Sequence, residues 1–442
     1  MTQHATKHGV SGVVQAQAFW AGATLDTVLR AEGIPGRVFY DHDGKTKKDP
    51  IKTLSDAGLN AFRVETFPRQ CLGPTVFDNA HDPTGQELLF QLDFGCIDIK
   101  VKAAQQAIAL GMKFQLTINQ GFTIPTEWEK YTHQEMLLAV QKETKRQLQP
   151  FLNAKIVPDI ILLENEGTSG FLFTENSTGH IRGVGDAKTN AATTDKELCG
   201  QLPHGNLASY PLLAGFYKGE VHACNEAIKA AGFSTAAVRY GLHSHGQYVQ
   251  WKEAVVHGPD PRSQTTLMTH SGATCNFTGV IPADLLSEDV ADTLTIMGFS
   301  AYPDPIAPVD VNSVKSQADT LGRLNATLSQ LQGYAVTKGK WTEGPFKGQY
   351  RLQALGVEYA TRFTQEQVPQ QMAHTKMMWD LVKGYSVMLG ILWYEPWYCY
   401  GDWEGGDATM SLRLNGQKGE SGEKPRDTLK VWGKAAVSPW KV

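Results

Sequence analysis

Hydrophobic and polar positions follow two alternating periodicities along this chain. The stretches "IKTLSDAGLNAFRVETF" and "VKAAQQAIALGMKFQLTIN" each begin with apolar residues at helical spacing, pass through a glycine turn and continue as a short apolar run. A helix that stops at a glycine and is followed directly by a strand is half of a β-α-β unit. The pattern therefore predicts helices that alternate with parallel strands.

Further apolar runs predict strands at 156–164, 237–243, 293–301, 352–359 and 388–394, and a first strand near 18–23. With the two strands above, these make eight, and helical stretches separate most of them. Since no Pro/Ser-rich linker divides the chain, the alternation favours one (β/α)8 barrel over residues 1–442. A doubly wound open sheet is the alternative, but no G-x-G-x-x-G opens a helix after any strand.

One segment without any period interrupts the alternation. Residues 174–207, "TENSTGHIRGVGDAKTNAATTDKELCGQLPHGNL", are rich in Gly, Thr and Asn and predict a long loop after the fourth strand. Loops that follow barrel strands line the active face, so this loop either borders the site or is a surface insertion without function. Residues 413–442 are expected to form an extension that packs on the barrel.

Composition excludes several classes of partner. The chain is 41% hydrophobic and 19% charged with a net charge of -4, so it presents no basic field to a nucleic acid or an anionic membrane. No run approaches the roughly 18 to 20 apolar residues that a membrane span needs, and "MTQHATKHGV" lacks the apolar core of a signal peptide. We expect a soluble monomer without nucleic-acid or membrane partners.

Cysteines and glycosylation sequons point to an oxidising compartment. The even set of cysteines contains no C-x-x-C pair, which favours disulfides over zinc or redox sites and leaves 15 possible pairings. These cysteines are Cys71, Cys96, Cys199, Cys224, Cys275 and Cys399. Three sequons begin at Asn176, Asn276 and Asn325. Together they predict a secreted, extracellular glycoprotein whose signal peptide has been removed or replaced by Met1.

The carboxyl ends of the predicted strands carry the candidate functional residues, because in a barrel those ends face the active site. The two glutamates among them matter most. Glu166 closes the fourth strand in "ILLENEGTSG", and Glu358 lies in the apolar run "ALGVEYA", where a lone carboxylate is costly to bury unless it is paired or used. The full set is Arg63, Asn119, Asn165, Glu166, His243, Tyr302, Glu358 and the run from Trp393 through Tyr394 to Trp397. Glu343 in "KWTEGPF" is an alternative whose neighbours are typical of a loop.

Two converging carboxylates are what glycosidic bond cleavage requires. One protonates the leaving oxygen while the other attacks the anomeric carbon or activates water, and an amide such as Asn165 can hydrogen-bond the 2-hydroxyl of the sugar. The structural alternatives are a helix-capping role for the Asn165-Glu166 pair and a buried ion pair for Glu358. Glu164, two positions before Glu166, is interpreted as a structural charge paired within the barrel.

Aromatic residues cluster just past the last predicted strand. "ILWYEPWYCYGDW" includes Trp393, Tyr394 and Trp397, whose flat rings could stack on the apolar faces of pyranoses or wall the barrel mouth for stability. "HSH", at 243–245, could be a metal pair, but no third ligand follows by spacing, and neither a metal nor another cofactor is expected. The absence of a G-x-S-x-G motif and of a P-loop argues against acyl and phosphoryl transfer.

Five segments, in order, resemble the endo-β-1,4-galactanases of glycoside hydrolase family 53, which belong to a clan of retaining (β/α)8 enzymes. They are "FYDHDGKTKKDPIKTLSDAGLNAFRVETF", "LDFGCIDIKVKAAQQAIALGMKFQLTI", "PDIILLENEGTSGFLF", "MGFSAYP" and "LGILWYEPWY". The resemblance runs from about residue 19 to 412 and is interrupted by insertions. It implies that Glu166 is the acid/base with Asn165 as the sugar-binding amide, and that Glu358, within "YRLQALGVEYA", is the nucleophile.

The same resemblance implies roles for residues around the pair. Arg63 matches the strand-two arginine that would hold the nucleophile ionised, Tyr302 matches the strand-six tyrosine, and Tyr394, or else Trp393, takes the position of the strand-eight tryptophan. Two positions depart from the family: Thr24 stands where an Asp is usual, and Asn119 where a His is usual. Because these positions line the substrate cleft, the reaction type transfers better than the substrate.

The expected function is therefore a secreted retaining glycoside hydrolase that cleaves a β-linked galactan or a related β-glycan by double displacement. If the loop at 174–207 folds across the cleft, the enzyme would instead be exo-acting or limited to short chains. The alternative from another class is a catalytically silent sugar-binding barrel.

Overall fold

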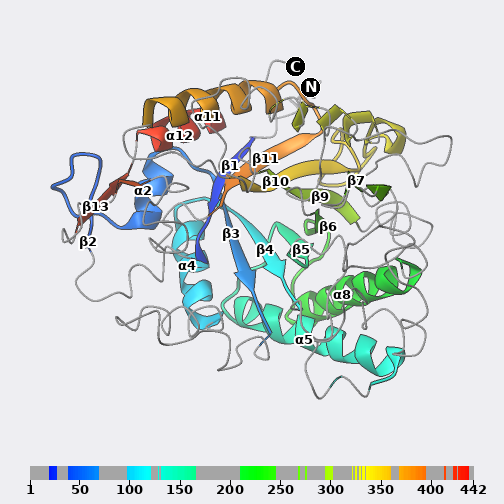
Figure 1. The fold of residues 1–442 in the computed structure, drawn as a ribbon. Coiled ribbons are helices and arrows are strands. Elements are labelled where there is room, and N and C mark those ends of the chain that lie inside the picture. Colours follow the sequence, from blue (N-terminus) through cyan, green and yellow to red (C-terminus); the bar gives the residue numbers. More distant parts are fainter. Residues whose placement is uncertain are drawn as a thin grey trace, which may run out of the picture.

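Eight parallel strands close into a barrel with helices around it (Figure 1). The computed structural model describes residues 19–26, 38–68, 97–120, 128, 131–165, 210–244, 267–268, 274–275, 294–301, 321, 324–325, 328–329, 331–333, 335–359, 368–394, 413–414, 422–425 and 427–437. The barrel strands are β1 (Trp20–Thr24), β3 (Ala61–Thr66), β4 (Lys113–Ile118), β5 (Ile160–Leu163), β6 (Arg239–Ser244), β9 (Leu294–Ala301), β10 (Gln353–Tyr359) and β11 (Met388–Trp393). These are the eight strands that the sequence predicted, and the (β/α)8 fold is confirmed.

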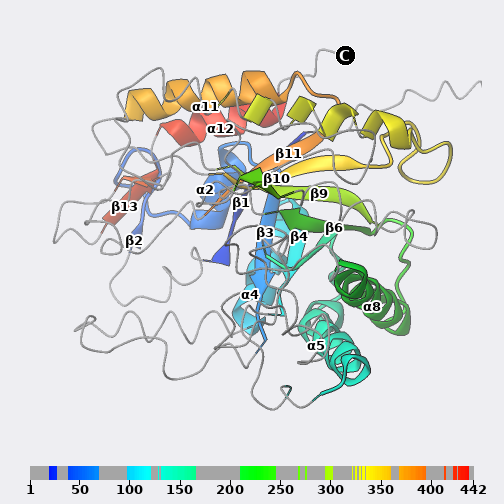
Figure 2. The ribbon, with the colours of Figure 1, turned by 45° about the vertical axis from the view of Figure 1, so that its right-hand side comes forward.

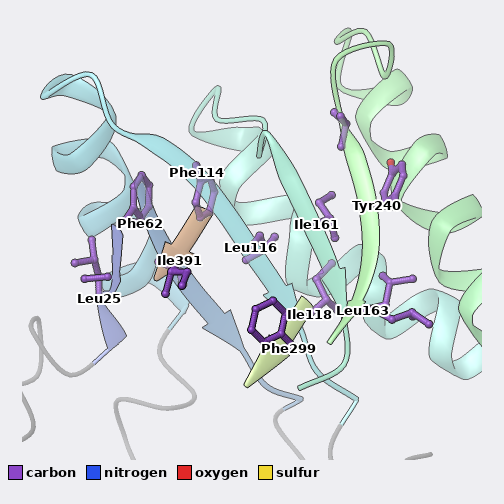
Figure 3. Close-up of a cluster of buried hydrophobic side chains, with 14 of the residues drawn as sticks. Leu25, Phe62, Phe114, Leu116, Ile118, Ile161, Leu163, Tyr240, Phe299 and Ile391 are labelled. Carbon is purple, nitrogen blue, oxygen red and sulfur yellow. The ribbon is translucent and has the colours of Figure 1, made fainter. Parts of the chain in front are cut away.

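The strands are buried on both faces, as expected when helices cover one face and the barrel encloses the other. The outer face carries large side chains that pack under the helices, for example Phe62 and Phe114, whose rings stack with centroids 4.7 Å apart (Figure 3). A separate inner cluster includes Ala61, Leu162 and Val357. Side chains at alternate positions therefore belong to different cores, and any break in this alternation changes which core a residue enters.

The described helices lie on the outside of the barrel. They are α2 (Pro50–Asp56), α4 (Ile97–Ala109), α5 (His133–Asn153), α8 (Tyr210–Ala230), α11 (Val368–Val382) and α12 (Thr428–Val437). Helix α5 begins with a capping box, in which Thr132 and Glu135 satisfy each other's backbone N–H groups. It packs along α8, as both views show (Figure 2).

Helix α12 ties the end of the chain to the first strand. Trp432 is fully buried, donates its indole N–H to the carbonyl of Gly22 in β1 at 2.9 Å, and packs against Trp379 of α11 with ring centroids 4.7 Å apart. At the neighbouring Gly433 an added Cβ would lie 1.6 Å from the carbonyl oxygen of Ala57. Only glycine allows this approach of two backbones, so α12 fits one position on the barrel.

Small sheets lie outside the barrel. Strand β2 (Val38–Phe39) pairs with β13 (Gly422–Pro425), which pairs with β12 (Arg413–Leu414), and β7 (Leu267–Met268) pairs with β8 (Thr274–Cys275). The predicted loop at 174–207 lies outside the described residues. None of the described helices combines the length and apolarity needed to cross a membrane.

The prediction of a fully paired set of six cysteines is wrong for Cys224. This residue is a free thiol, fully buried on α8, and burial raises its pKa well above the ordinary value. Its surroundings are the apolar core, where Cys acts as a small hydrophobic residue. Of the three sequon asparagines, the structure describes Asn325, whose side chain is exposed and accepts a hydrogen bond from the Tyr385 hydroxyl at 2.5 Å.

Candidate active site

A buried arginine organises the polar side chains at the carboxyl ends of the strands. Arg63, fully buried on β3, forms an ion pair with Glu358 of β10 at 2.8 Å and donates to Asn165 Oδ1 at 2.7 Å. Its Nε–H donates to Thr117 of β4 at 3.0 Å, and its Nη2 lies 3.2 Å from Glu65. The guanidinium fork thus joins residues of β3 and β4, the residue Asn165 just after β5, and Glu358 of β10, which lies three strands from β3 around the barrel.

Five side chains form a closed hydrogen-bonded ring, which we call the Arg63 ring. From Arg63 it passes to Glu358, whose second oxygen accepts from Ser300 Oγ at 3.4 Å. Ser300 lies 2.9 Å from His243 Nε2, and His243 Nδ1 lies 2.8 Å from Asn165 Oδ1, which returns to Arg63. The sequence predicted four of these five residues as site residues, and the structure brings those four together.

Proton counting assigns the directions of these bonds. Asn165 Oδ1 accepts from Arg63, so the bond from His243 Nδ1 must also be a donation to that oxygen. The single Ser300 hydroxyl proton can point either to His243 Nε2 or to Glu358.

A second carboxylate, Glu65, lies on the other side of Arg63. It accepts from Asn119 Nδ2 at 3.1 Å and is buried, and burial raises its pKa to about 7, helped by Glu358 and Asp26 and opposed by Arg63. Asp26 is paired with Lys100 at 3.1 Å and accepts the backbone N–H of Glu65. Burial lowers the pKa of Arg63, but the neighbouring acids Glu65, Glu358 and Asp26 and the Tyr394 hydroxyl raise it overall.

Glu358 reaches the barrel interior through an irregularity in its strand. Leu355 and Val357 belong to the inner cluster, so regular alternation would place Glu358 outside. The pairing of β10 with β9 and with β11 shifts register after Gly356, and with this shift both Val357 and Glu358 face inward while Tyr359 packs outward on Trp432. Such bulges commonly re-aim side chains beside active sites.

Asn165 enters the barrel through a left-handed residue. Glu164 has φ +62°, one of two positive values among the described non-glycine residues. Leu162 lies in the inner cluster and Asn165 reaches Arg63, so the chain turns over at Glu164 between them. A non-glycine residue in this conformation is strained and persists only where its surroundings hold it.

The surroundings that hold Glu164 are not those the sequence predicted. Its buried carboxyl accepts the backbone N–H of Gln120 with both oxygens, at 2.9 and 3.0 Å, and the Gln120 side chain donates to buried Glu220 of α8 at 2.9 Å. Burial raises the pKa of both glutamates, and for Glu164 the charge of Glu220 adds to this. The interpretation of Glu164 as one member of an ion pair is wrong within the described part of the chain: it meets a carboxyl group through an amide, and its pKa is raised instead.

The other predicted site residues fall into separate groups. Glu166, Tyr302 and Trp397 lie outside the described residues. Trp393 is fully buried on the outer side of β11, edge-on to Trp432 at 4.9 Å, so its ring packs in the aromatic core and does not reach the Arg63 ring. Its neighbour Tyr394 lies close enough to Arg63 to raise the pKa of the guanidinium.

Three polar residues of the site were missed from the sequence. Glu65 could have been found, because it follows Arg63 by two positions in "RVETF" and side chains at this spacing share one face of a strand. Ser300 and Asp26 carry no comparable signal. Thr24 is fully buried, and its hydroxyl has no hydrogen-bond partner among the described residues; the carboxylate near this end of β1 comes from Asp26 instead.

The sequence also offered two alternatives for the site, Glu343 and a metal site at 243–245. Glu343 is exposed in the segment between Gly339 and Arg351, which precedes β10 and so lies at the opposite end of the barrel from Glu358. The residues that the structure describes contain no cluster of three potential metal ligands, and His245 of the "HSH" motif is outside them.

Comparisons with known proteins locate the fold among glycoside hydrolases. No protein-family profile and no curated protein sequence matches this chain. The glycoside hydrolase family 53 catalytic domain of Ignisphaera aggregans superposes with a TM-score of 0.57 and 14% identity, covering 94% of this chain and 95% of that domain. One of two fungal β-1,4-galactanases superposes with a TM-score of 0.56 and 14% identity, covering 94% of this chain and 99% of that chain. A β-glycosidase superposes with a TM-score of 0.50 and 12% identity, covering 96% of this chain and 98% of that chain. The chain therefore has the barrel fold of these glycoside hydrolases, with family 53 galactanases among its structural neighbours.

Proposed function

We propose that this protein is a retaining glycoside hydrolase that cleaves a β-linked galactan or a related β-glycan. The observation that carries the proposal is the buried Glu358 carboxylate, held 2.8 Å from Arg63 at the carboxyl end of the barrel, together with Asn165 on the same guanidinium. A carboxylate that is paired with a cation, oriented and close to an amide able to bind the sugar is what a glycosidase nucleophile requires. The fold shared with galactanases supports the substrate class.

In the proposed first step Glu358 attacks the anomeric carbon while Glu166 protonates the departing oxygen. In the second step Glu166 deprotonates the water that releases the sugar from Glu358. Because Oδ1 of Asn165 is occupied by Arg63 and His243, its Nδ2 amide is the group that can donate to the sugar 2-hydroxyl. Arg63 and Ser300 orient the two oxygens of Glu358 for attack.

Substitution of the two glutamates tests the assignment. Glu166→Gln and Glu358→Gln should each lower kcat on β-1,4-galactan by at least about a hundredfold, because each removes a proton donor or a nucleophile while keeping shape. Glu343→Gln, at the opposite end of the barrel, is the matched control and should leave kcat unchanged. Near-normal hydrolysis by either of the first two variants would overturn the assignment, and proton NMR of the first-formed anomer should show retention.

The product profile separates the open alternatives. A ladder of oligosaccharides from the earliest times indicates endo cleavage, whereas release of one short product indicates that the segment at 174–207 blocks the cleft. Sugar binding without turnover on a panel of β-linked polysaccharides would identify a silent sugar-binding barrel. Secretion is part of the proposal, supported by the three sequons, and mass spectrometry of Asn325 in protein from a eukaryotic host tests it.

A further inference from the structure

A cavity of about 600 Å³ opens at the amino-terminal end of the barrel, opposite the Arg63 ring. Its walls come from the end of α8 and the turn after it, from the first residues of β6 and β9, and from the segment before β10. That segment, 339–351, is held by backbone hydrogen bonds, including Trp341 N–H to the Gln349 carbonyl at 2.9 Å and Gly348 N–H to the Trp341 carbonyl at 2.8 Å. The cavity is thus preformed and within the size range of sites for small ligands.

A buried cation without a counter-ion lines this cavity. Arg239 is 4% exposed, and its hydrogen bonds go to Gln353 Oε1, to Thr295 Oγ1 at 3.0 Å and to the Thr295 carbonyl at 3.1 Å. These neutral acceptors take three of its five N–H groups, and no carboxylate among the described residues pairs with it. Burial lowers its pKa to about 9, as expected for a charge that lacks a compensating anion.

Other groups around the cavity complement an anion with a flat apolar body. Lys340 and Arg351 add positive charge, and among the described residues of the lining Glu343 is the one carboxylate. The Arg239 guanidinium lies 5.1 Å from the centroid of the Phe346 ring, which is itself 6.4 Å from that of Trp341. The Trp341 indole N–H is buried without an acceptor in the described part of the chain, so it is a second donor without a partner.

We infer that this cavity is a second ligand site, for a small organic anion with a phosphate or carboxylate head group. The head group would accept hydrogen bonds from Arg239 and the Trp341 indole, and the body would pack on Phe346. The site is independent of the proposed glycosidase chemistry. It differs from Arg63, whose charge is already balanced by Glu358 and Glu65.

Calorimetric titration of the purified full-length chain tests this site. Phenyl phosphate and benzoate carry the two candidate head groups on the same ring, and benzyl alcohol is the neutral control. At least one anion should bind saturably with a dissociation constant of about 1 mM or below, while benzyl alcohol should not. Glu358→Gln should bind the anion as the unaltered protein does, which distinguishes this cavity from the Arg63 ring.

Charge variants localise the binding. Lys340→Met should weaken it and Glu343→Gln should tighten it, each by about threefold, because both side chains are exposed and act through partly screened charge. Lys102→Met, an equal change of net charge at an exposed position of α4, is the control and should leave the affinity unchanged. Arg239→Gln should abolish binding; if that variant does not fold, the two exposed variants decide. Absence of saturable binding up to about 10 mM, equal binding of benzyl alcohol, or unchanged affinity in both exposed variants would overturn the inference.

Discussion

Leu162 and Asn165 both face the interior of the barrel, although they are three positions apart on one strand and its extension. In a regular strand such residues would point to opposite faces. The left-handed conformation of Glu164 between them reverses the alternation and sends its own carboxyl outward to Gln120 and Glu220. The position of the Asn165 amide therefore depends on a strained residue that does not itself face the Arg63 ring.

Glycine and alanine at position 164 should separate conformation from chemistry. Both variants lose the carboxyl group, but only glycine adopts positive φ without strain, so Glu164→Gly should be more stable than Glu164→Ala by about 1 kcal/mol. Urea denaturation measures the difference, and Glu164→Ala should also show the larger loss of kcat. Equal stability of the two variants would mean that the conformation of residue 164 does not hold Asn165 in place.

Removal of the Arg63 charge should be among the most damaging changes in the protein. Arg63→Met leaves Glu358 and Glu65 buried without their cation, and breaking a buried pair in this way costs about 3 to 5 kcal/mol. Arg63→Lys keeps the charge but cannot bond Glu358, Asn165 and Thr117 together, so it should retain more stability than Arg63→Met while still losing activity. Denaturant midpoints and kcat, measured on the same samples, check both statements.

Stability should fall as the pH rises from about 4.5 through neutrality. Glu65, with its pKa raised from 4.5 to about 7, holds its proton more tightly in the folded protein, so its contribution is complete below pH 4.5 and is lost as the pH rises through 7. Glu164 and Glu220 act in the same direction because their pKa values are also raised.

Glu220→Gln should therefore flatten the decline in the free energy of unfolding between pH 5 and 8, since the amide keeps an oxygen acceptor for Gln120 and does not ionise. Glu226→Gln is the matched control on the same helix. Because Lys145 and His222 lower the pKa of Glu226, removing this carboxyl group should not reduce the decline in the free energy of unfolding between pH 5 and 8. An unchanged slope in Glu220→Gln would show that Glu220 does not release a proton in this range.

Cys224 should not react with thiol reagents in the folded protein. It is fully buried with a raised pKa, so labelling at pH 8 should detect it only after denaturation, and peptide mapping should find it outside any disulfide. Cys224→Ser should lower the free energy of unfolding by about 1 to 3 kcal/mol, because the hydroxyl enters an apolar environment. Cys224→Ala, which buries no polar group, should cost less. Labelling of Cys224 under native conditions would contradict the placement of this helix.

Periodicity predicted the barrel because each strand shows an apolar run and several helices, such as α2, α4 and α8, end in a glycine turn. The same reasoning selected Arg63, Asn165, His243 and Glu358, which it placed at the carboxyl ends of the predicted strands, although Arg63 is the third residue of β3. It could not predict their orientation, because regular alternation would bring Glu164 inward and leave Asn165 and Glu358 outside. The three side chains take their observed directions from a positive φ and a register shift, and neither leaves a mark in the hydrophobic pattern.

The same limitation explains Trp393 and Glu65. A cluster of aromatic residues in the sequence does not indicate which rings face outward. Trp393 packs edge-on against Trp432, which is distant in sequence and belongs to no local pattern. Glu65 was not predicted as a site residue because a charged residue near a strand end is common in sequences. Its spacing of two positions from Arg63 nevertheless indicates that both side chains lie on one face of the strand.

The hydrogen bond from Trp432 to Gly22 joins residues 410 positions apart. Loop-closure entropy has to be overcome before so distant a contact contributes to stability, which makes such topologies slow to fold. On the ribosome, β1 is synthesised long before its neighbour β11 and the covering helix α12. Barrel closure therefore has to wait for the synthesis of β11, and until then the edge of β1 that pairs with β11 is exposed to pairing with other chains.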